Sequence, residues 1–227
     1  MKKIVQILVI IALAMLCYEM VAQNAQPTNG QVISPNGIEM VYVEGQGNIK
    51  SFYIGKYELT HQAWQAVMGS ARSKDAKDDR PLTKTSWLDF KVFIKRLNEL
   101  SGRTYRLPTE AEWEFAAKGG TLSHGYTYSG SNNIDEVAWY QKNSKSKDFL
   151  TAELPGTKKP NELGIYDMTG NVWEICEDCY DNKCDSRTFR GGSAWNDAKI
   201  NRIETRGGAK PDNMTRYDVG FRLVLEP

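Results

Sequence analysis

Gly164-Ile165-Tyr166-Asp167-Met168-Thr169-Gly170-Asn171-Val172-Trp173-Glu174 is the stretch on which the interpretation of this 227-residue chain depends. Its carboxylates and its amide make it too polar for a buried strand. Its glycines make it a poor candidate for a stable helix, because glycine loses the most backbone freedom on ordering. The stretch, called here the 164–174 loop, is therefore predicted to be a shaped loop that enters a short strand.

Two interpretations of the 164–174 loop follow from its residues. Asp167 and Glu174 carry hard oxygen ligands, and glycines let neighbouring backbone carbonyls turn toward a common centre, which is how Ca²⁺ is usually held. The alternative is a tight turn in which Asp167 and Asn171 cap their own backbone. Residue types and spacing alone leave both open.

The N-terminal residues 1–22 have the pattern of a secretory signal. Positive charge at Lys2 and Lys3 precedes a mostly apolar run over residues 4–17, which is too short for a membrane span. A lipid anchor at Cys17 is disfavoured because a bulky leucine precedes it. We expect an exported protein that is periplasmic, on the cell surface or secreted, with no transmembrane span after cleavage.

Beyond the signal, the composition predicts a flexible leader over residues 23–37 and one domain over residues 38–227. The leader is polar and rich in turn-forming residues. Loss of residues 1–22 takes two lysines and one glutamate from a formal net charge of +1, which leaves a neutral chain. Because the chain also lacks a basic block, nothing favours nucleic acid as a partner.

Three cysteines of the mature chain, Cys176, Cys179 and Cys184, lie within nine residues. Outside the cytoplasm, a disulfide between two of them is expected, with the pairing open. A zinc site would need a fourth ligand at a usual spacing, and the sequence does not provide one. The only histidines are His61 and His124, which disfavours multi-histidine metal sites.

Regular elements are few and lie in the first half of the chain. β-Prone residues and a glycine-containing turn predict a hairpin of residues 38–43 with residues 52–57. Helices are predicted after the caps Thr60 and Ser86, and after a capping box of Thr109 with Glu112. Beyond Gly120 the sequence predicts turns and short strands.

Five motifs occur in an order that resembles the sulfatase-modifying-factor family, which is named for the formylglycine-generating enzyme. The resemblance implies an irregular α+β fold related to C-type lectins, with few helices, short antiparallel strands and many loops. The motifs are Phe52-Tyr53-Ile54-Gly55-Lys56-Tyr57-Glu58-Leu59-Thr60, Tyr105-Arg106-Leu107-Pro108-Thr109-Glu110-Ala111-Glu112-Trp113-Glu114, Gly170-Asn171-Val172-Trp173-Glu174, Arg190-Gly191-Gly192-Ser193 and Gly220-Phe221-Arg222-Leu223.

The resemblance also indicates what this chain lacks. Enzymes of the family oxidise a cysteine of a client sulfatase to formylglycine with O₂, using copper held by two cysteines. The positions that match those cysteines are Asn196 and Asn201. Because Cu(I) prefers soft sulfur ligands, neutral amides do not replace thiolates. No catalytic residues and no copper are therefore expected in this divergent member.

The same resemblance carries a structural calcium to the 164–174 loop. The implied ligands are the side chains of Asp167 and Glu174 and the backbone carbonyls of Gly170 and Val172. The backbone supplies two of the four, so all four positions keep the required chemistry.

These observations favour an exported, non-catalytic protein that binds an unknown protein or glycan ligand or serves assembly at the envelope. One alternative is a formylglycine-generating-type oxidase, or an altered oxidoreductase, that acts on a sulfatase cysteine. Another is a retroelement-diversified lectin-like protein, because aromatic and amide side chains suit a ligand surface; drift on loops is the simpler explanation of the same residues. That surface would comprise Trp195, Asn196, Asn201, Ile203, Thr205, Asn213, Thr215 and Tyr217.

Overall fold

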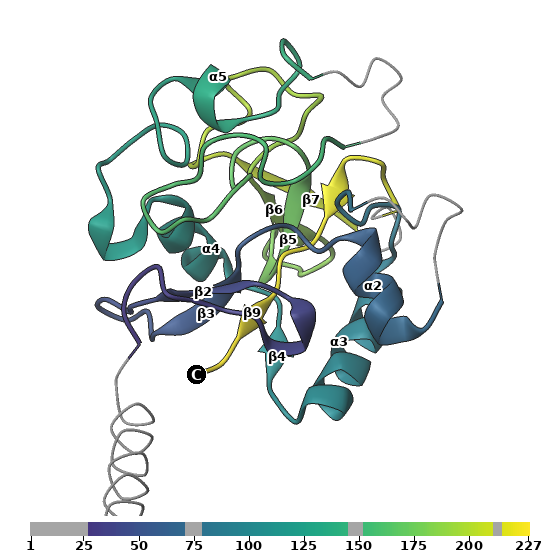
Figure 1. Cartoon of the computed structure of the whole chain (residues 1–227). Helices are drawn as coiled ribbons and strands as arrows, with labels where there is room; N and C mark the ends of the chain where they lie inside the picture. Colours follow the sequence, from purple (N-terminus) through teal and green to yellow (C-terminus); the bar gives the residue numbers. More distant parts are fainter. Residues whose placement is uncertain (1–26, 71–78, 145–151, 211–214) are drawn as a thin grey trace, which may run out of the picture.

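A computed structural model describes residues 27–70, 79–144, 152–210 and 215–227 (Figure 1). The predicted signal over residues 1–22, with Cys17, lies outside these ranges. Within them, no helix combines the length and apolar character that a membrane crossing needs.

The first sheet has five short strands, and its centre contains residues from distant parts of the chain. Its order is β1 (Val32–Ile33), β2 (Met40–Val43), β3 (Phe52–Gly55), β9 (Val224–Leu225) and β4 (Tyr105–Arg106), with antiparallel neighbours throughout. The β2–β3 pair confirms the predicted hairpin.

Strand β1 corrects the prediction of a flexible leader, because residues 27–37 belong to the fold. Val32 pairs with Val41, and a 3₁₀ turn, η1 (Pro35–Gly37), leads into β2. The Gly30 amide donates to the Tyr42 carbonyl at 3.0 Å. These bonds use the backbone, and the Val32 side chain is 42% exposed, so the composition of the segment gave no sign of its order.

Two of the predicted helices pack together beside the first sheet (Figure 1). Helix α2 (His61–Met68) begins at the cap Thr60 and ends at Gly69, and α3 (Trp87–Ser101) begins at Ser86 and ends at Gly102. Both glycines have the left-handed backbone that glycine adopts without strain. Stacked aromatic rings of Trp64, Phe90, Phe93 and Phe221 join the helices to the core.

Helix α4 (Glu110–Ala117) carries the predicted capping box, with both of its hydrogen bonds formed. Its Trp113, Ala116 and Ala117 are fully buried against the first sheet and the 164–174 loop. A 3₁₀ turn, η2 (Gly120–Leu122), follows, and one short helix that the sequence did not predict, α5 (Ile134–Val137), lies among the loops.

The second sheet has the order β7 (Arg206–Ala209), β6 (Arg187–Arg190), β5 (Trp173–Cys179) and β8 (Val219–Gly220). Strands β5 and β8 are parallel, and the other pairs are antiparallel. With its short strands, few helices and long loop segments, the chain confirms the predicted irregular α+β fold.

Candidate functional site

The 164–174 loop has the predicted form, since it enters strand β5 at Trp173. Asp167, Gly170 and Asn171 all have positive φ, between 56° and 82°. At Gly170 a side chain would collide with the carbonyl oxygen of Trp139. Glycine is therefore required at this position by space as well as by conformation.

Glu174 is completely buried and paired with Arg222. The guanidinium reaches one carboxylate oxygen at 2.6 Å and the other at 2.8 Å, and the Trp113 indole donates to Glu174 at 2.7 Å. Arg222 also donates to the carbonyls of Gly55 and Tyr166. This one buried side chain therefore ties the first sheet, the 164–174 loop and β5 together.

Two further carboxylates are buried close by, each with one unpartnered oxygen. Asp167 is 3% exposed; its Oδ2 accepts from the Gly156 amide at 2.6 Å, and Oδ1 has no partner. Glu58 is 2% exposed; its Oε2 accepts from Asn171 at 3.2 Å, and Oε1 has no partner. Buried polar atoms are normally hydrogen-bonded, so these two oxygens need an explanation.

The electrostatics of Glu58 and Asp167 follow from this burial. Loss of solvent, strengthened by the nearby charge of Asp167, raises the pKa of Glu58 well above its usual range. Loss of solvent raises the pKa of Asp167 to about 6. Arg222 opposes both shifts, but of these three carboxylates it donates hydrogen bonds to Glu174 and not to Glu58 or Asp167. The interior is therefore short of positive charge beside Glu58 and Asp167.

The predicted calcium ligands fit a cation in part. The unpartnered Oδ1 of Asp167 is an oxygen of the kind that Ca²⁺ takes. Both oxygens of Glu174 already accept hydrogen bonds from Arg222 and Trp113, so Glu174 would have to share them. Glu58 was missed by the sequence analysis, although an acidic residue between Tyr57 and Leu59 was a visible signal.

Asn196 and Asn201, at the positions of the family cysteines, shape the loop that carries them. Ser193 donates to Asn196 Oδ1 at 2.9 Å, and the Asn201 amide donates to the carbonyls of Asn196 and Asp197 at 3.0 and 2.8 Å. Asn201 is completely buried. The donor set at this place holds no soft sulfur and does not fit copper.

The predicted ligand surface does not form one exposed patch. Asn201 and Ile203 are at most 3% exposed, which corrects their assignment to a surface. The reason is local, because the Ile203 side chain joins the core around α4 and its carbonyl accepts from buried Arg190. Trp195, Asn196 and Thr205 are half-buried, Thr215 and Tyr217 are exposed, and Asn213 lies outside the described residues.

The structure joins two of the three cysteines and leaves the third free. Cys179 pairs with Cys184 across the connection between β5 and β6. Cys176 is free and buried, and burial raises the pKa of its thiol well above the usual value. A thiol in that setting is poorly reactive, since the thiolate is the nucleophile.

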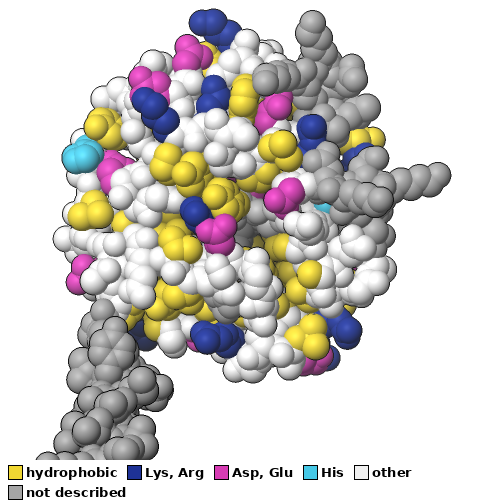
Figure 2. Space-filling model, viewed as in Figure 1, with side chains coloured by type: hydrophobic (Ala, Val, Ile, Leu, Met, Phe, Trp, Pro, Cys, Tyr) yellow, Lys and Arg dark blue, Asp and Glu magenta, His cyan; other side chains and the backbone are white. Residues whose placement is uncertain are grey.

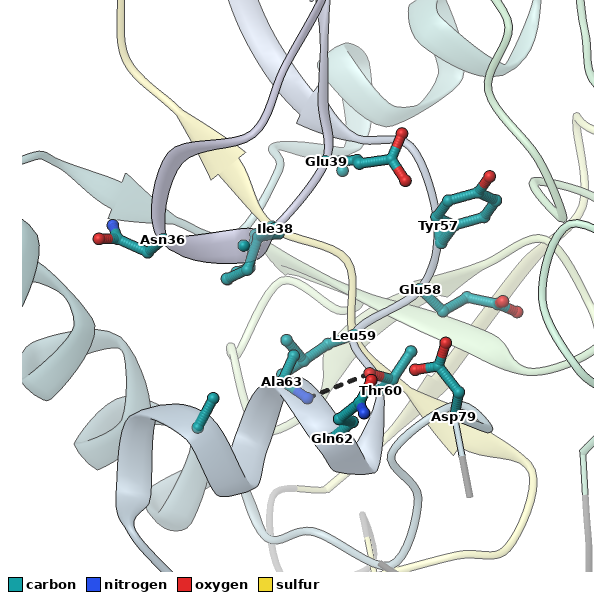
Figure 3. Close-up of a pocket in the computed structure, with 14 residues that line it drawn as sticks. Asn36, Ile38, Glu39, Tyr57, Glu58, Leu59, Thr60, Gln62, Ala63 and Asp79 are labelled. Carbon is teal, nitrogen blue, oxygen red and sulfur yellow. Dashed lines mark hydrogen bonds between the residues drawn. The ribbon is translucent and has the colours of Figure 1, made fainter. Parts of the chain in front are cut away.

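A pocket of about 310 Å³ opens between η1, the segment from β3 to α2, and α2 itself (Figure 3). Figure 2 shows hydrophobic side chains gathered around a hollow on this face. Glu39, Glu58 and Asp79 are its charged lining residues. Among the described residues that line it there is no lysine or arginine.

Comparison with known proteins shows to which family the chain belongs. The model of the sulfatase-modifying factor enzyme 1-like domain matches residues 20–227. The chain belongs to the sulfatase-modifying factor family. Chaperone protein LppX of Paenibacillus barcinonensis is 34% identical to it over 81% of the chain and 83% of the relative.

Two further proteins extend the comparison. Inactive C-alpha-formylglycine-generating enzyme 2 of Bos taurus is 31% identical over 71% of the chain, which spans 55% of that relative's length. The solved structure of Treponema denticola variable protein 1 superimposes with a TM-score of 0.71 at 24% identity, covering 89% of the chain and all of that protein. At this identity the likeness concerns the fold alone.

Proposed function

We propose that this protein is an exported, non-catalytic member of the family that binds a polypeptide partner at the cell envelope. The observation that carries the proposal is the pair Asn196 and Asn201, whose amides bond within their own loop where the family's oxidases hold copper. Without soft ligands, the copper-dependent activation of O₂ has no place in this loop.

The choice of a polypeptide as the bound partner is supported by the relatives. One that aligns with most of the chain is named a chaperone, and another is named inactive. Export is supported by the pattern of residues 1–22 and by the bridge between Cys179 and Cys184, since disulfides persist in oxidising compartments.

The non-catalytic part of the proposal is tested by a direct assay. The chain from Gln23 onward is incubated with Cu(I), O₂ and a cysteine-containing sulfatase peptide, and the peptide is examined by mass spectrometry for formylglycine. We expect no conversion, and no Cu(I) taken from a chromophoric chelator. Conversion of the peptide by the unaltered chain would sink the proposal.

A matched variant tests whether the amides of Asn196 and Asn201 are the reason why the chain takes up no Cu(I). Asn196→Cys combined with Asn201→Cys restores the sulfur donors at both positions, and we expect that double variant to take Cu(I) from the chelator. Leu88→Cys with Leu122→Cys, at exposed positions on α3 and η2, is the control with the same number of added thiols. Equal Cu(I) uptake by the two double variants would contradict the assignment of this loop.

The binding part is tested in cells that carry the gene. Deletion is expected to lower the abundance of the partner in the envelope or secreted fraction, measured by quantitative proteomics. The unaltered chain and an Asn196→Ser variant should restore that abundance equally, because the proposed role does not use redox chemistry. Unchanged fractions after deletion would contradict a chaperone-like role.

A further inference from the structure

The bridge between Cys179 and Cys184 closes a turn that is also held by other bonds. The two cysteines are five positions apart. The Tyr180 amide donates to the Ser186 carbonyl at 2.8 Å, and the Asp181 carboxylate accepts from two backbone amides of the turn at 3.0 and 3.2 Å. A bridge across so short a segment adds less to stability than a bridge across a long one. The turn can therefore keep its shape when the bridge opens.

The two sulfur atoms of the bridge differ in their surroundings. Cys184 is exposed, whereas Cys179 is half-buried. Arg187 Nη1 lies 3.8 Å from Cys179 Sγ and is fixed by a bond of 2.7 Å to the Glu177 carbonyl. The guanidinium also lies over the Trp87 ring, 4.9 Å from its centroid. Because a neighbouring cation stabilises a thiolate, Cys179 is the better leaving group and Cys184 is the sulfur that an attacking thiolate can reach.

Four carboxylates on the same connection would oppose a thiolate, but each is engaged or exposed. Glu177 is paired with Lys91 at 3.2 Å, and Asp178 accepts from a backbone amide at the start of α4 at 2.6 Å. Asp181 is used within the turn, and Asp185 is exposed, where solvent ions screen its charge. The charge in direct contact with a sulfur of the bridge is that of Arg187.

Tyr180, which follows Cys179, offers a contact surface next to the bridge. Its side chain is 42% exposed. A side chain at Gly208 in β7 would collide with the Tyr180 ring, and the Arg206 guanidinium lies 5.3 Å from the ring centroid. The ring is thus supported from below and open to solvent, and such a ring can contact the residues that flank a cysteine in another polypeptide.

We propose that Cys179 and Cys184 form a thiol–disulfide exchange site whose substrate is a cysteine pair of another polypeptide. The activity is additional to the proposed function, because it uses neither Asn196 nor Asn201. It is stoichiometric, since the described part of each chain holds one bridge. Cys176 takes no part, because it is buried and its thiol has a raised pKa.

The exchange transfers the bridge in two steps. A thiolate of the substrate attacks the Cys184 sulfur, which forms an intermolecular disulfide and breaks the bond to Cys179. The electron pair of that bond goes to Cys179, which leaves as a thiolate beside Arg187. The second thiolate of the substrate then attacks the substrate sulfur of the intermolecular disulfide and releases Cys184. The substrate is oxidised to a disulfide, the bridge is reduced, and the two protons of the substrate thiols end on Cys179 and Cys184.

The position of attack is tested on the unaltered chain from Gln23 onward. The probe is acetyl-Ala-Cys-Ala-amide, whose single thiol stops the reaction at the intermolecular disulfide. Free thiols are trapped with N-ethylmaleimide, and mass spectrometry locates both groups. We expect the probe on Cys184 and the maleimide on Cys179. The probe on Cys179, or shared equally between the two cysteines, would overturn the proposal.

The rate of exchange tests the contribution of Arg187. Reduced acetyl-Cys-Gly-Gly-Cys-amide is mixed with the chain, and its disulfide is followed by mass spectrometry. The control is the oxidised peptide of residues 178–185, which has the same bridge without Arg187. We expect the chain to react at least about threefold faster than this peptide, because a stabilised thiolate leaves faster. A chain that reacts no faster than the peptide would overturn the proposal.

A pair of variants gives the same test within the chain. Arg187→Gln should slow the reaction about threefold. Arg103→Gln, at an exposed position beyond the end of α3 that is opposite to Trp87, should leave the rate unchanged. If Arg187→Gln fails to fold, the position of the probe and the peptide control still decide.

The outcomes separate this inference from the proposed function. Failure of exchange would leave the non-catalytic role untouched, because that role is measured by formylglycine formation and Cu(I) uptake. Formylglycine formation by the unaltered chain would remove the functional proposal and not the exchange site.

Discussion

Arg222 determines which buried carboxylates are stable as anions. It forms a bidentate pair with Glu174, and such pairs offset the cost of burial only when the remaining polar atoms are also bonded. Two backbone carbonyls and the Trp113 indole meet that condition here. Glu58 and Asp167 form no such pair with Arg222, and the pKa of each is raised by burial.

Asp167 predicts an unusual dependence of stability on pH. Its pKa is 3.8 ordinarily and about 6 in the folded protein. Between these values the folded state holds a proton that the unfolded chain has released, so the free energy of unfolding falls as the pH rises. Asp167→Asn should remove this fall, which amounts to about 1.4 kcal/mol for each unit of pKa difference.

Urea unfolding with chelator present, from about pH 4 to about pH 7, measures this contribution as the difference between the variant and the unaltered chain. Asp185→Asn, at an exposed position, is the control and should follow the unaltered chain. Parallel curves for Asp167→Asn and the unaltered chain would show that Asp167 ionises normally.

Calcium gives a second prediction at the same residue. If Ca²⁺ supplies the partner that Asp167 Oδ1 lacks, calcium raises the thermal unfolding midpoint, because a ligand of the folded state stabilises it according to its affinity. We expect Asp167→Asn to lose this rise and Asp185→Asn to keep it. No rise in the unaltered chain would favour the capped-turn interpretation of the 164–174 loop.

Strand β1 protects the edge of the first sheet, and the sequence did not predict it. It covers the outer edge of β2, and the Tyr42 amide donates to the Gln31 carbonyl at 2.8 Å. Asn29 adds a bond of 2.6 Å to the Glu44 amide. An uncovered strand edge offers free backbone donors and acceptors to other chains.

Removal of β1 is therefore predicted to cost stability and solubility. A chain that begins at Ile38 loses these bonds, and we expect a free energy of unfolding lower by at least about 2 kcal/mol, since each net hydrogen bond contributes about 1 kcal/mol. Urea unfolding and light scattering compare it with a chain that begins at Pro27. Equal stability of the two chains would support the earlier prediction that residues 23–37 are a flexible leader.

Helix α4 shows why some elements were predictable. Its capping box needs only Thr109 and Glu112, three residues apart, so the signal was local. The same holds for the caps and glycine ends of α2 and α3. Strand β1 lacks such a local signal, because it depends on a partner strand. Helix α5 has a local cap at Asn133, but its four residues are too few to show a helical repeat.

For the whole molecule, ordered motifs were enough to predict the fold, whereas the site was predicted only in part. Asp167 and Glu174 both lie in the 164–174 loop, and their role as calcium ligands stays a prediction. Glu174 and Arg222 are 48 residues apart in the sequence, and Glu58 and Asn171 are 113 apart. No local sequence pattern could therefore predict either contact. Asn201 and Ile203 were assigned to a surface because residue type does not tell which side of a loop is buried.

The position of β9 has a consequence for how the chain is made. Val224 and Leu225 lie between β3 and β4, although they come about 170 and 120 residues later in the chain. On the ribosome, the first sheet therefore stays open until Val224 has emerged, and partly synthesised chains expose the facing edges of β3 and β4. Completion of the first sheet is thus a late step in folding, because it waits for a contact between residues that are distant in sequence.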